Sequence, residues 1–288
     1  MSEICKNWTE WLKKNRFAGQ TPEMIEQTTR WLEAVRDVIL VYAEIQPTDT
    51  VLDIGCGTGL LAFKALEMQN CEGNVIFSDM FQDCLDDCKK ILDEAGVKKG
   101  YELLKCPVEH IALPMSTVHK AVMRSVLVHV VNKQPAISEI YRVLKPGGKF
   151  CAFEPIIRSN TRYWEILDPK YIDKYEDFKR VENEIMDNPL DSLCNFDENT
   201  LKTNLEIAGF SVPEVKLQEV KSNYVVQPNM VREWFVNPPS PTQPSTKDRF
   251  LKYFDFPTVE KFMLQVEDYL TGRNISLKTN AAFINATK

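Results

Sequence analysis

The chain has 288 residues, of which 44% are hydrophobic and 26% are charged, and its formal net charge at pH 7 is −6. This length suits one large domain, with or without insertions, and the apolar share is sufficient for a substantial core. Lys and Arg are scattered and acidic residues outnumber them. The sequence therefore offers no basic surface for nucleic acid or for an anionic membrane.

The first residues do not resemble a secretory signal, because the stretch MSEICKNWTEWLKKNRF is charged and interrupted by polar side chains. The longest apolar run, AVMRSVLVHVV, contains Arg124 and is well short of the ~20 residues that span a bilayer. We therefore expect a cytoplasmic protein with no stable membrane insertion.

Eight cysteines are spread over the whole chain, which is not the density of a disulfide-stapled secreted domain. Cys84 and Cys88 lie four residues apart, but no second pair follows at ligand spacing and the three histidines form no HxxxH. The sequence therefore predicts free thiols and no metal site.

Residues 22–45 are expected to form a long helix, because apolar side chains recur there at spacings of three and four. Thr21 suits the N-cap and Pro22 the first helical position. A shorter helix over 4–15 is expected before it. Residues 1–45 are together interpreted as an N-terminal helical cap.

Between residues 46 and 155, short apolar runs alternate with segments of helical periodicity. This alternation predicts a parallel sheet whose two faces are both covered by helices. The expected strands lie at 50–55, 74–79, 101–106, 120–127 and 149–155, and the expected helices at 58–69, 80–96 and 134–148.

The pattern changes in two segments, 156–196 and 222–275, which are rich in charged and aromatic residues. Helix and strand patterns resume at 197–221 and 276–288. We interpret 46–155 and these two resumed segments as one core domain that carries two insertions, rather than as two independent domains. The aromatic residues of the insertions either line a ligand pocket or form small cores of their own.

The segment VLDIGCGTG, residues 51–59, joins an expected strand to an expected helix through three glycines. A dinucleotide-binding turn has the spacing G-x-G-x-x-G and a P-loop ends in Gly-Lys-Ser/Thr, and neither fits here. Small residues let the backbone approach a ligand closely, and the neighbouring acid favours a positively charged one. S-adenosylmethionine, with its ammonium and sulfonium groups, fits this pattern, whereas a diphosphate would be repelled. The residues expected to bind it here are Asp53, Gly55, Cys56, Gly57, Thr58 and Gly59.

A second acid, Asp79, ends the next expected strand, 20 residues after Gly59. In open α/β sheets, an acid at this place hydrogen-bonds the hydroxyls of a ribose. Alone, it would serve equally well as the cap of the next helix. The glycine loop and Asp79 together favour a nucleoside-containing ligand.

On these residues the chain resembles the class I S-adenosylmethionine-dependent methyltransferases, in particular the small-molecule group that includes ubiquinone/menaquinone-type enzymes. Three further stretches are similar to that family: VEHIALP (108–114), MRSVLVHV (123–130) and EIYRVLKPGGKFCAFEP (139–155). The resemblance implies S-adenosylmethionine as cofactor. It also implies an α/β, doubly wound, mostly parallel seven-stranded Rossmann-like sheet with an antiparallel last strand, to which the sequence pattern adds the helical cap and the two insertions.

The resemblance implies which residues meet each part of the cofactor. The glycine loop would hold the methionine part, Asp79 the ribose hydroxyls, and Met80 would pack on the adenine.

Further positions follow from the next two loops. Val108, Glu109 and His110 would meet the adenine amino group, and Glu109 stands where the family usually has Asp. Arg124 and Ser125 would line the cofactor where the fourth strand ends.

Methyl transfer from a sulfonium is an in-line displacement, to which alignment and exclusion of water contribute most. A general base is needed only when the acceptor is a protonated hydroxyl, thiol or acidic carbon. His129, after the fourth strand, is the first candidate, because histidine changes its charge nearest to neutral pH; the alternative is a histidine that only caps or packs against a helix. Glu154, at the end of the fifth strand, is the second candidate. We expect a small-molecule acceptor, whose site or lid is formed by the cap and the two insertions.

Three alternatives stay open. A protein with this loop could bind the cofactor as a non-catalytic partner or regulatory protein. An arsenite-type methyltransferase would need three cysteines near the acceptor, for which Cys56, Cys106 and Cys151 are available. An aminopropyl transferase would need acids around a polyamine site, where the insertions carry aromatic residues instead. The sequence does not indicate the oligomeric state.

Overall fold

The computed structural model describes residues 22–238 and 243–288, which fall into two compact units. Both segments that the sequence analysis interprets as insertions lie within the second unit. The helix expected over 4–15 lies outside the described residues. The first unit consists of the described residues up to Glu154 with Glu198–Leu217 and Ala282–Lys288, and the second consists of Pro155–Asp197 and Gln218–Ala281.

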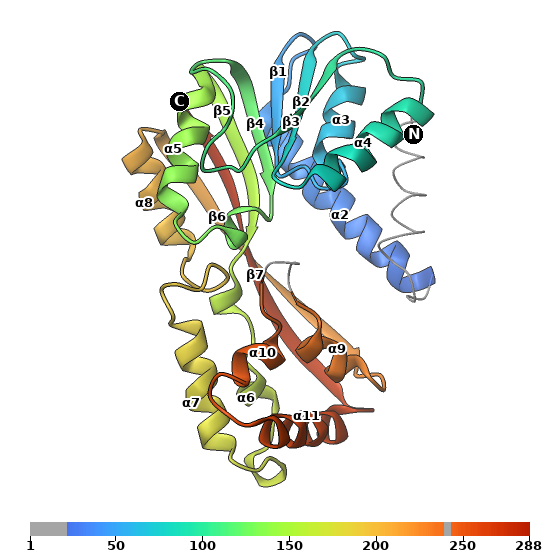
Figure 1. Cartoon of the computed structure of the whole chain (residues 1–288), viewed down its shortest axis with the longest axis vertical. Coiled ribbons are helices and arrows are strands. Elements are labelled where there is room, and N and C mark those ends of the chain that lie inside the picture. The colour runs from blue at the N-terminus through green and yellow to red at the C-terminus, as the bar shows by residue number, and fades with distance from the viewer. Residues whose placement is uncertain (1–21, 239–242) are drawn as a thin grey trace. The chain divides into compact units, whose positions relative to one another are not determined.

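A seven-stranded sheet has the strand order β3-β2-β1-β4-β5-β7-β6 (Figure 1). In this order, β3, β2, β1 and β4 each pair in parallel with the next strand, as far as β5. The last strand runs antiparallel to β5, since the Gly147 amide donates to the Lys288 carbonyl at 2.9 Å and the Ile156 amide donates to the Asn280 carbonyl at 2.8 Å. The predicted seven-stranded Rossmann-like sheet is therefore confirmed. Its strands are β1 (Thr50–Ile54), β2 (Asn74–Asp79), β3 (Tyr101–Lys105), β4 (Val118–Arg124), β5 (Leu144–Pro155), β6 (Ser211–Val225) and β7 (Asn274–Thr287).

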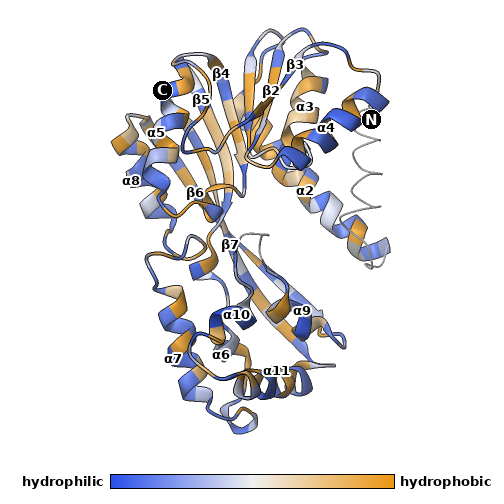
Figure 2. Cartoon of the chain, viewed as in Figure 1, coloured by the Kyte–Doolittle hydropathy of each residue, from blue (hydrophilic) through white to orange (hydrophobic). Residues whose placement is uncertain are grey.

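Helices cover both faces of the sheet in the first unit (Figure 1). The order steps one way from β1 to β3 and the other way from β4 to β5, so right-handed crossovers put α3 and α4 on one face and α5 on the other. Strands buried on both faces are apolar over most of their length, and Figure 2 shows hydrophobic colours along much of the central strands, with polar residues toward some strand ends. The helices of this unit are α2 (Pro22–Ala43), α3 (Leu60–Met68), α4 (Gln82–Glu94), α5 (Lys133–Val143) and α8 (Glu198–Ala208).

Local sequence explains where these helices begin and end. Gly96 follows the end of α4 with a φ of +71°, a left-handed conformation that glycine adopts readily. Asn132 caps α5, because its side chain accepts the Gln134 amide. The expected end of this helix at residue 148 is wrong: the chain enters β5 at Leu144, which pairs with Val118 of β4.

The second unit has a core of its own, rich in aromatic side chains. Phe178 stacks on Phe262 with ring centroids 3.7 Å apart, and Tyr163 stacks on Phe235 at 4.8 Å. Such pairs contribute about 0.5–1.5 kcal/mol beyond area burial, so these rings stabilise the unit itself. None of the helices in the described parts of the chain has the length and hydropathy that crossing a bilayer requires. The helices of this unit are α6 (Tyr163–Ile166), α7 (Tyr175–Met186), α9 (Met230–Val236), α10 (Thr246–Phe250) and α11 (Phe256–Leu270).

Candidate cofactor site

The loop between β1 and α3 is closed against the protein at both ends and open in the middle. A Cβ added at Gly55, where φ is +62°, would lie 2.5 Å from Cγ2 of Val126, and one at Gly59, where φ is +85°, would lie 2.4 Å from Cε2 of Phe63. Only glycine fits these two positions without displacement. A Cβ at Gly57 would meet no described atom within 4 Å, so the middle of the loop faces open space.

Asp53, the acid before the loop, is only 1% exposed. Its Oδ2 accepts the Ala62 amide at 2.9 Å, in the first turn of α3, where the helix dipole favours a carboxylate. Burial nevertheless raises the pKa of Asp53 to about 8, against the opposing effects of that amide and of Arg124. Asp53 thus positions α3 rather than presenting a full charge to a ligand, and its contact with the methionine part stays a prediction. The Cys56 amide donates to the Ser78 carbonyl at 2.8 Å and ties the loop to β2.

Asp79, at the end of β2, is 7% exposed and holds the loop directly. Its Oδ2 accepts the Gly57 amide and its Oδ1 accepts the Phe81 amide, both at 2.9 Å. A carboxylate has roughly four acceptor positions, so hydroxyl donors can still be accepted here. Met80 is 55% exposed beside it, and Thr58 is half-buried in the loop.

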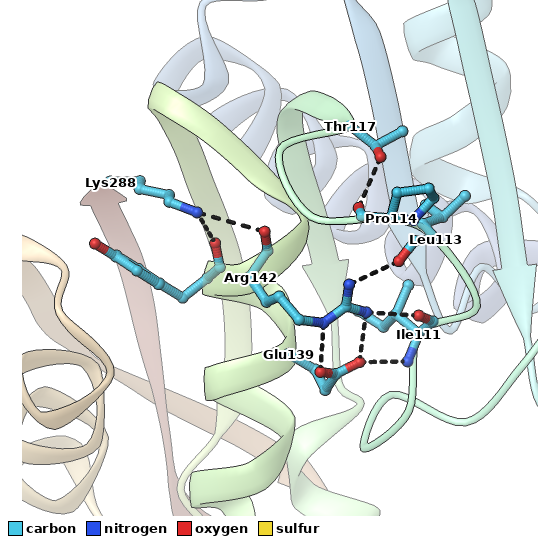
Figure 3. A network of polar contacts seen from close by, with 8 residues as sticks. Ile111, Leu113, Pro114, Thr117, Glu139, Arg142 and Lys288 are labelled. Carbon is cyan, nitrogen blue, oxygen red and sulfur yellow. Dashed lines mark hydrogen bonds and ion pairs between the residues drawn. The ribbon is translucent and has the colours of Figure 1, made fainter.

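Two residues of α5 clamp the loop between β3 and β4 (Figure 3). Arg142 donates to the carbonyls of Ile111 at 2.8 Å and Leu113 at 2.7 Å, while Glu139 accepts the Ile111 amide at 2.9 Å. The two side chains also pair with each other, at 2.6 Å between Nε and Oε1. That hydrogen bond lowers the pKa of Glu139 and raises the pKa of Arg142. Sequence reasoning missed this clamp, whose only signal is an acid and a base three residues apart in SEIYR.

The residues expected to meet the adenine lie directly before the clamped segment. Val108 is buried, whereas Glu109 and His110 are exposed. The His110 amide donates to the Pro107 carbonyl at 3.2 Å, which makes a tight turn. The clamp therefore fixes where these residues lie, and their contacts with adenine stay predictions.

The chain turns sharply where β4 ends at Arg124. Ser125 has a φ of +57°, and its amide donates to the Phe153 carbonyl at 2.8 Å. A non-glycine residue in this region is strained, and such strain is concentrated at functional sites. His129 closes the short 3-10 helix Leu127–His129 and is exposed. Its role as a base stays a prediction.

Glu154, the second base candidate, is fully buried and holds the turn after β4. Its Oε1 accepts the amides of Val126 at 2.8 Å and Leu127 at 3.0 Å, and its Oε2 accepts the Val128 amide at 3.1 Å. Burial raises the pKa of Glu154 to about 7, although these amides favour its ionised form. With both oxygens engaged away from solvent, Glu154 is suited to positioning this turn and not to taking a proton from an acceptor.

The carboxyl ends of β1 to β4 thus carry an open glycine loop, an acid that holds it, an exposed Met and a clamped loop. Ligands of open α/β sheets bind at such ends, and these groups fit the sulfonium nucleoside that the sequence analysis expects. Within residues 22–238 and 243–288, no group of three or more His, Cys, Asp or Glu side chains is arranged to hold a metal ion. The cysteine trio of an arsenite-type enzyme is therefore not assembled in this part of the chain.

Comparisons with known proteins agree with this geometry. The family model described as a methyltransferase domain matches residues 45–208. The ubiquinone/menaquinone biosynthesis C-methyltransferase UbiE of Francisella tularensis subsp. holarctica is 29% identical over 170 residues, which are 58% of this chain and 68% of the relative.

Two solved structures share the fold. A Bacillus halodurans C-125 protein superimposes with a TM-score of 0.56 and 21% identity, over 88% of this chain and 99% of its own. The phosphoethanolamine N-methyltransferase 2 of Haemonchus contortus superimposes with a TM-score of 0.54 and 16% identity, over 98% of this chain and 60% of its own. At these identities the likeness concerns the fold alone.

The methyltransferase family model covers more than half of the chain, including the glycine loop, the Asp79 strand and the Glu139–Arg142 clamp. The chain belongs to the methyltransferase-domain family and is a class I enzyme that uses S-adenosylmethionine as its methyl donor.

Proposed function

We propose that this enzyme transfers the methyl group of S-adenosylmethionine to a small-molecule acceptor. The observation that carries the proposal is the hydrogen bond of 2.9 Å from the Gly57 amide to Asp79. It holds the glycine loop against the acid at the end of β2, while the outer side of Gly57 faces open space. This arrangement leaves room for a ligand that touches the loop and the acid together.

Each part of the cofactor has residues that suit it. The loop at Gly55, Gly57 and Gly59 would take the methionine part, and Asp79 would accept hydrogen bonds from the ribose hydroxyls. The exposed Met80 would pack on the adenine ring.

The loop at 108–110 would meet the edge of the adenine ring, because Glu139 and Arg142 hold the segment that follows it. Arg124 and Ser125 would border the cofactor at the strained turn after β4.

The bound cofactor supplies an electrophilic methyl group on a sulfonium. The chain's own task is alignment and exclusion of water, which in well-oriented systems contributes about 7–11 kcal/mol. His129 would accept the acceptor's proton where the nucleophile carries one. Glu154 would keep the preceding turn in place through its three amide contacts.

The acceptor is a small molecule in this proposal, and the atom that receives the methyl group is left to experiment. That the second unit forms the acceptor site or a lid stays a prediction, and limited proteolysis with and without the cofactor tests it. The expected cytoplasmic location also stays a prediction.

Isothermal titration calorimetry with S-adenosylmethionine, S-adenosylhomocysteine, NADH and ATP tests the cofactor site. Binding of the two sulfur compounds alone is expected, and binding of NADH or ATP in their place would overturn the proposal. S-adenosylhomocysteine release with a panel of small nucleophiles then tests turnover. Release without any added acceptor, or only with RNA or protein, would contradict a small-molecule acceptor.

A further inference from the structure

A cavity of about 310 Å³ lies wholly within the second unit. Ligand pockets measure roughly 300–1,000 Å³, so the cavity is large enough for a small organic molecule. Its walls come from both inserted segments and from β7 and are mostly apolar, with four aromatic rings among them. These rings belong to Tyr163, Tyr224, Trp234 and Phe250.

The aromatic rings are held in place by their neighbours. Tyr163 stacks on Phe235 with ring planes 22° apart, and Tyr224 meets Trp234 edge to face, with centroids 6.5 Å apart and an angle of 86°. Aromatic faces attract organic cations, most strongly where the cation is shielded from water.

A buried acid also lines the cavity. Glu182 of α7 is 5% exposed, and it is the only acid among the described residues that form the cavity wall. Its Oε1 accepts the Tyr163 amide at 3.2 Å. Burial raises the pKa of Glu182 to about 7, so a cation bound beside it would stabilise its ionised form.

Three cationic residues line the same cavity, and two of them are paired with acids outside its wall. Arg249, which is 8% exposed, is ion-paired with Asp191, and Lys278 lies 3.9 Å from the carboxylate of Glu219. Neither of these two acids belongs to the cavity wall.

Arg162 is the third of these residues; its Nη2 donates to the Arg158 carbonyl at 3.0 Å, while its Nη1 is buried and has no hydrogen-bond partner among the described residues. Arg162 also lies near enough to Glu182 to favour the ionised form of that acid. A bound ammonium would therefore share Glu182 with this guanidinium, while its apolar body meets the aromatic wall.

We propose that the cavity of the second unit binds a small organic amine in its cationic form, with the ammonium group at Glu182 and the apolar body against Trp234 and Tyr224. This ligand site goes beyond methyl transfer and depends on residues of the second unit alone.

The test uses three phenylalkyl probes of similar size on the full chain: 2-phenylethylamine, 2-phenylethanol and 3-phenylpropionate. Calorimetry is expected to show that the amine binds at least about tenfold more tightly than the alcohol, and that the carboxylate binds most weakly. Trp234 fluorescence should change with the amine, and Trp234→Phe should remove that change.

Glu182→Gln keeps a carbonyl oxygen for the Tyr163 amide and removes the charge. It should bring the affinity for the amine down to that for the alcohol, which itself should not change. Glu184→Gln is the matched control, since Glu184 lies on the same helix with its side chain 45% exposed, and it should bind like the wild type.

No amine binding by the wild-type chain, tighter binding of the carboxylate, or equal amine affinity in Glu182→Gln would each overturn the proposal. Should Glu182→Gln fail to fold, the order of the three probes on the wild-type chain still decides it. Failure of S-adenosylhomocysteine to bind would count against the proposed function only.

Discussion

Replacing Asp79 by alanine removes the oxygens that the ribose is proposed to meet, together with the acceptors of the Gly57 and Phe81 amides. Two hydroxyl contacts at about 0.5–1.5 kcal/mol each would cost about 1–3 kcal/mol of cofactor binding. At ~1.4 kcal/mol for each tenfold, the Kd should rise roughly 5- to 150-fold. Release of the Gly57 amide adds to this loss, because the glycine loop is then no longer held.

Asp79→Asn helps to separate the loss of the ribose contacts from the loss of the amide acceptors that hold the glycine loop. The amide keeps one carbonyl oxygen, but its NH₂ group must face either the Gly57 or the Phe81 amide, so the loss should be smaller than for alanine yet measurable. The assay is calorimetric titration with S-adenosylhomocysteine, alongside thermal unfolding without ligand to confirm the fold. Asp83→Ala is the control, because Asp83 is an exposed acid in the first turn of α4. An unchanged Kd in a folded Asp79→Ala chain would refute the ribose assignment.

Three further changes have defined outcomes. Because burial raises the pKa of Asp53 to about 8, the native state binds more protons than the unfolded chain between about pH 4 and pH 8, and this contribution to stability is lost as pH rises through that range. Asp53→Asn mimics the neutral acid and does not titrate. Urea unfolding should therefore show the variant gaining stability relative to wild type as pH rises from about 4 to about 8, by at most ~1.4 kcal/mol per pH unit. A difference in unfolding free energy between the two chains that stays constant with pH would contradict the raised pKa. Arg142→Ala frees the carbonyls of Ile111 and Leu113. The Ile111 amide should then exchange hydrogen faster, and S-adenosylhomocysteine should bind more weakly. An unchanged exchange rate would show that Arg142 does not hold the loop between β3 and β4 in place. His129→Asn should lower kcat by about 10²-fold or more without changing the Kd for S-adenosylhomocysteine if the histidine is the base, and an unchanged kcat would leave it a purely structural residue.

The order of strands and helices could be predicted because a parallel sheet covered by helices produces hydrophobic patterns that are visible in short stretches of sequence. The short apolar runs of β1 and β2 are strands buried on both faces, and the helices between strands show their own periodicity. The start of β5 could not be placed this way. Leu144 joins the sheet through pairing with Val118, 26 residues earlier, and the helical periodicity of α5 runs up to that point without a break.

The candidate site likewise has residues that local sequence reveals and residues that only the folded structure reveals. The glycine loop and Asp79 are adjacent to strand ends, so short motifs reveal them. Glu154 looks like any acid at a strand end, and its role emerges only from contacts with amides 26 to 28 residues earlier. Arg142 likewise looks like one half of an ordinary surface pair until the carbonyls of the clamped loop are seen beside it.

The path of the chain between its two units has a practical consequence. The polypeptide passes from one unit to the other after Glu154, Asp197, Leu217 and Ala281, and the last two of these crossings fall inside β6 and β7. A single protease nick within the second unit therefore cannot detach it, and no one continuous gene fragment encodes it. Grafting this unit onto a related enzyme would require two exchanged segments, one of them with junctions inside hydrogen-bonded strands.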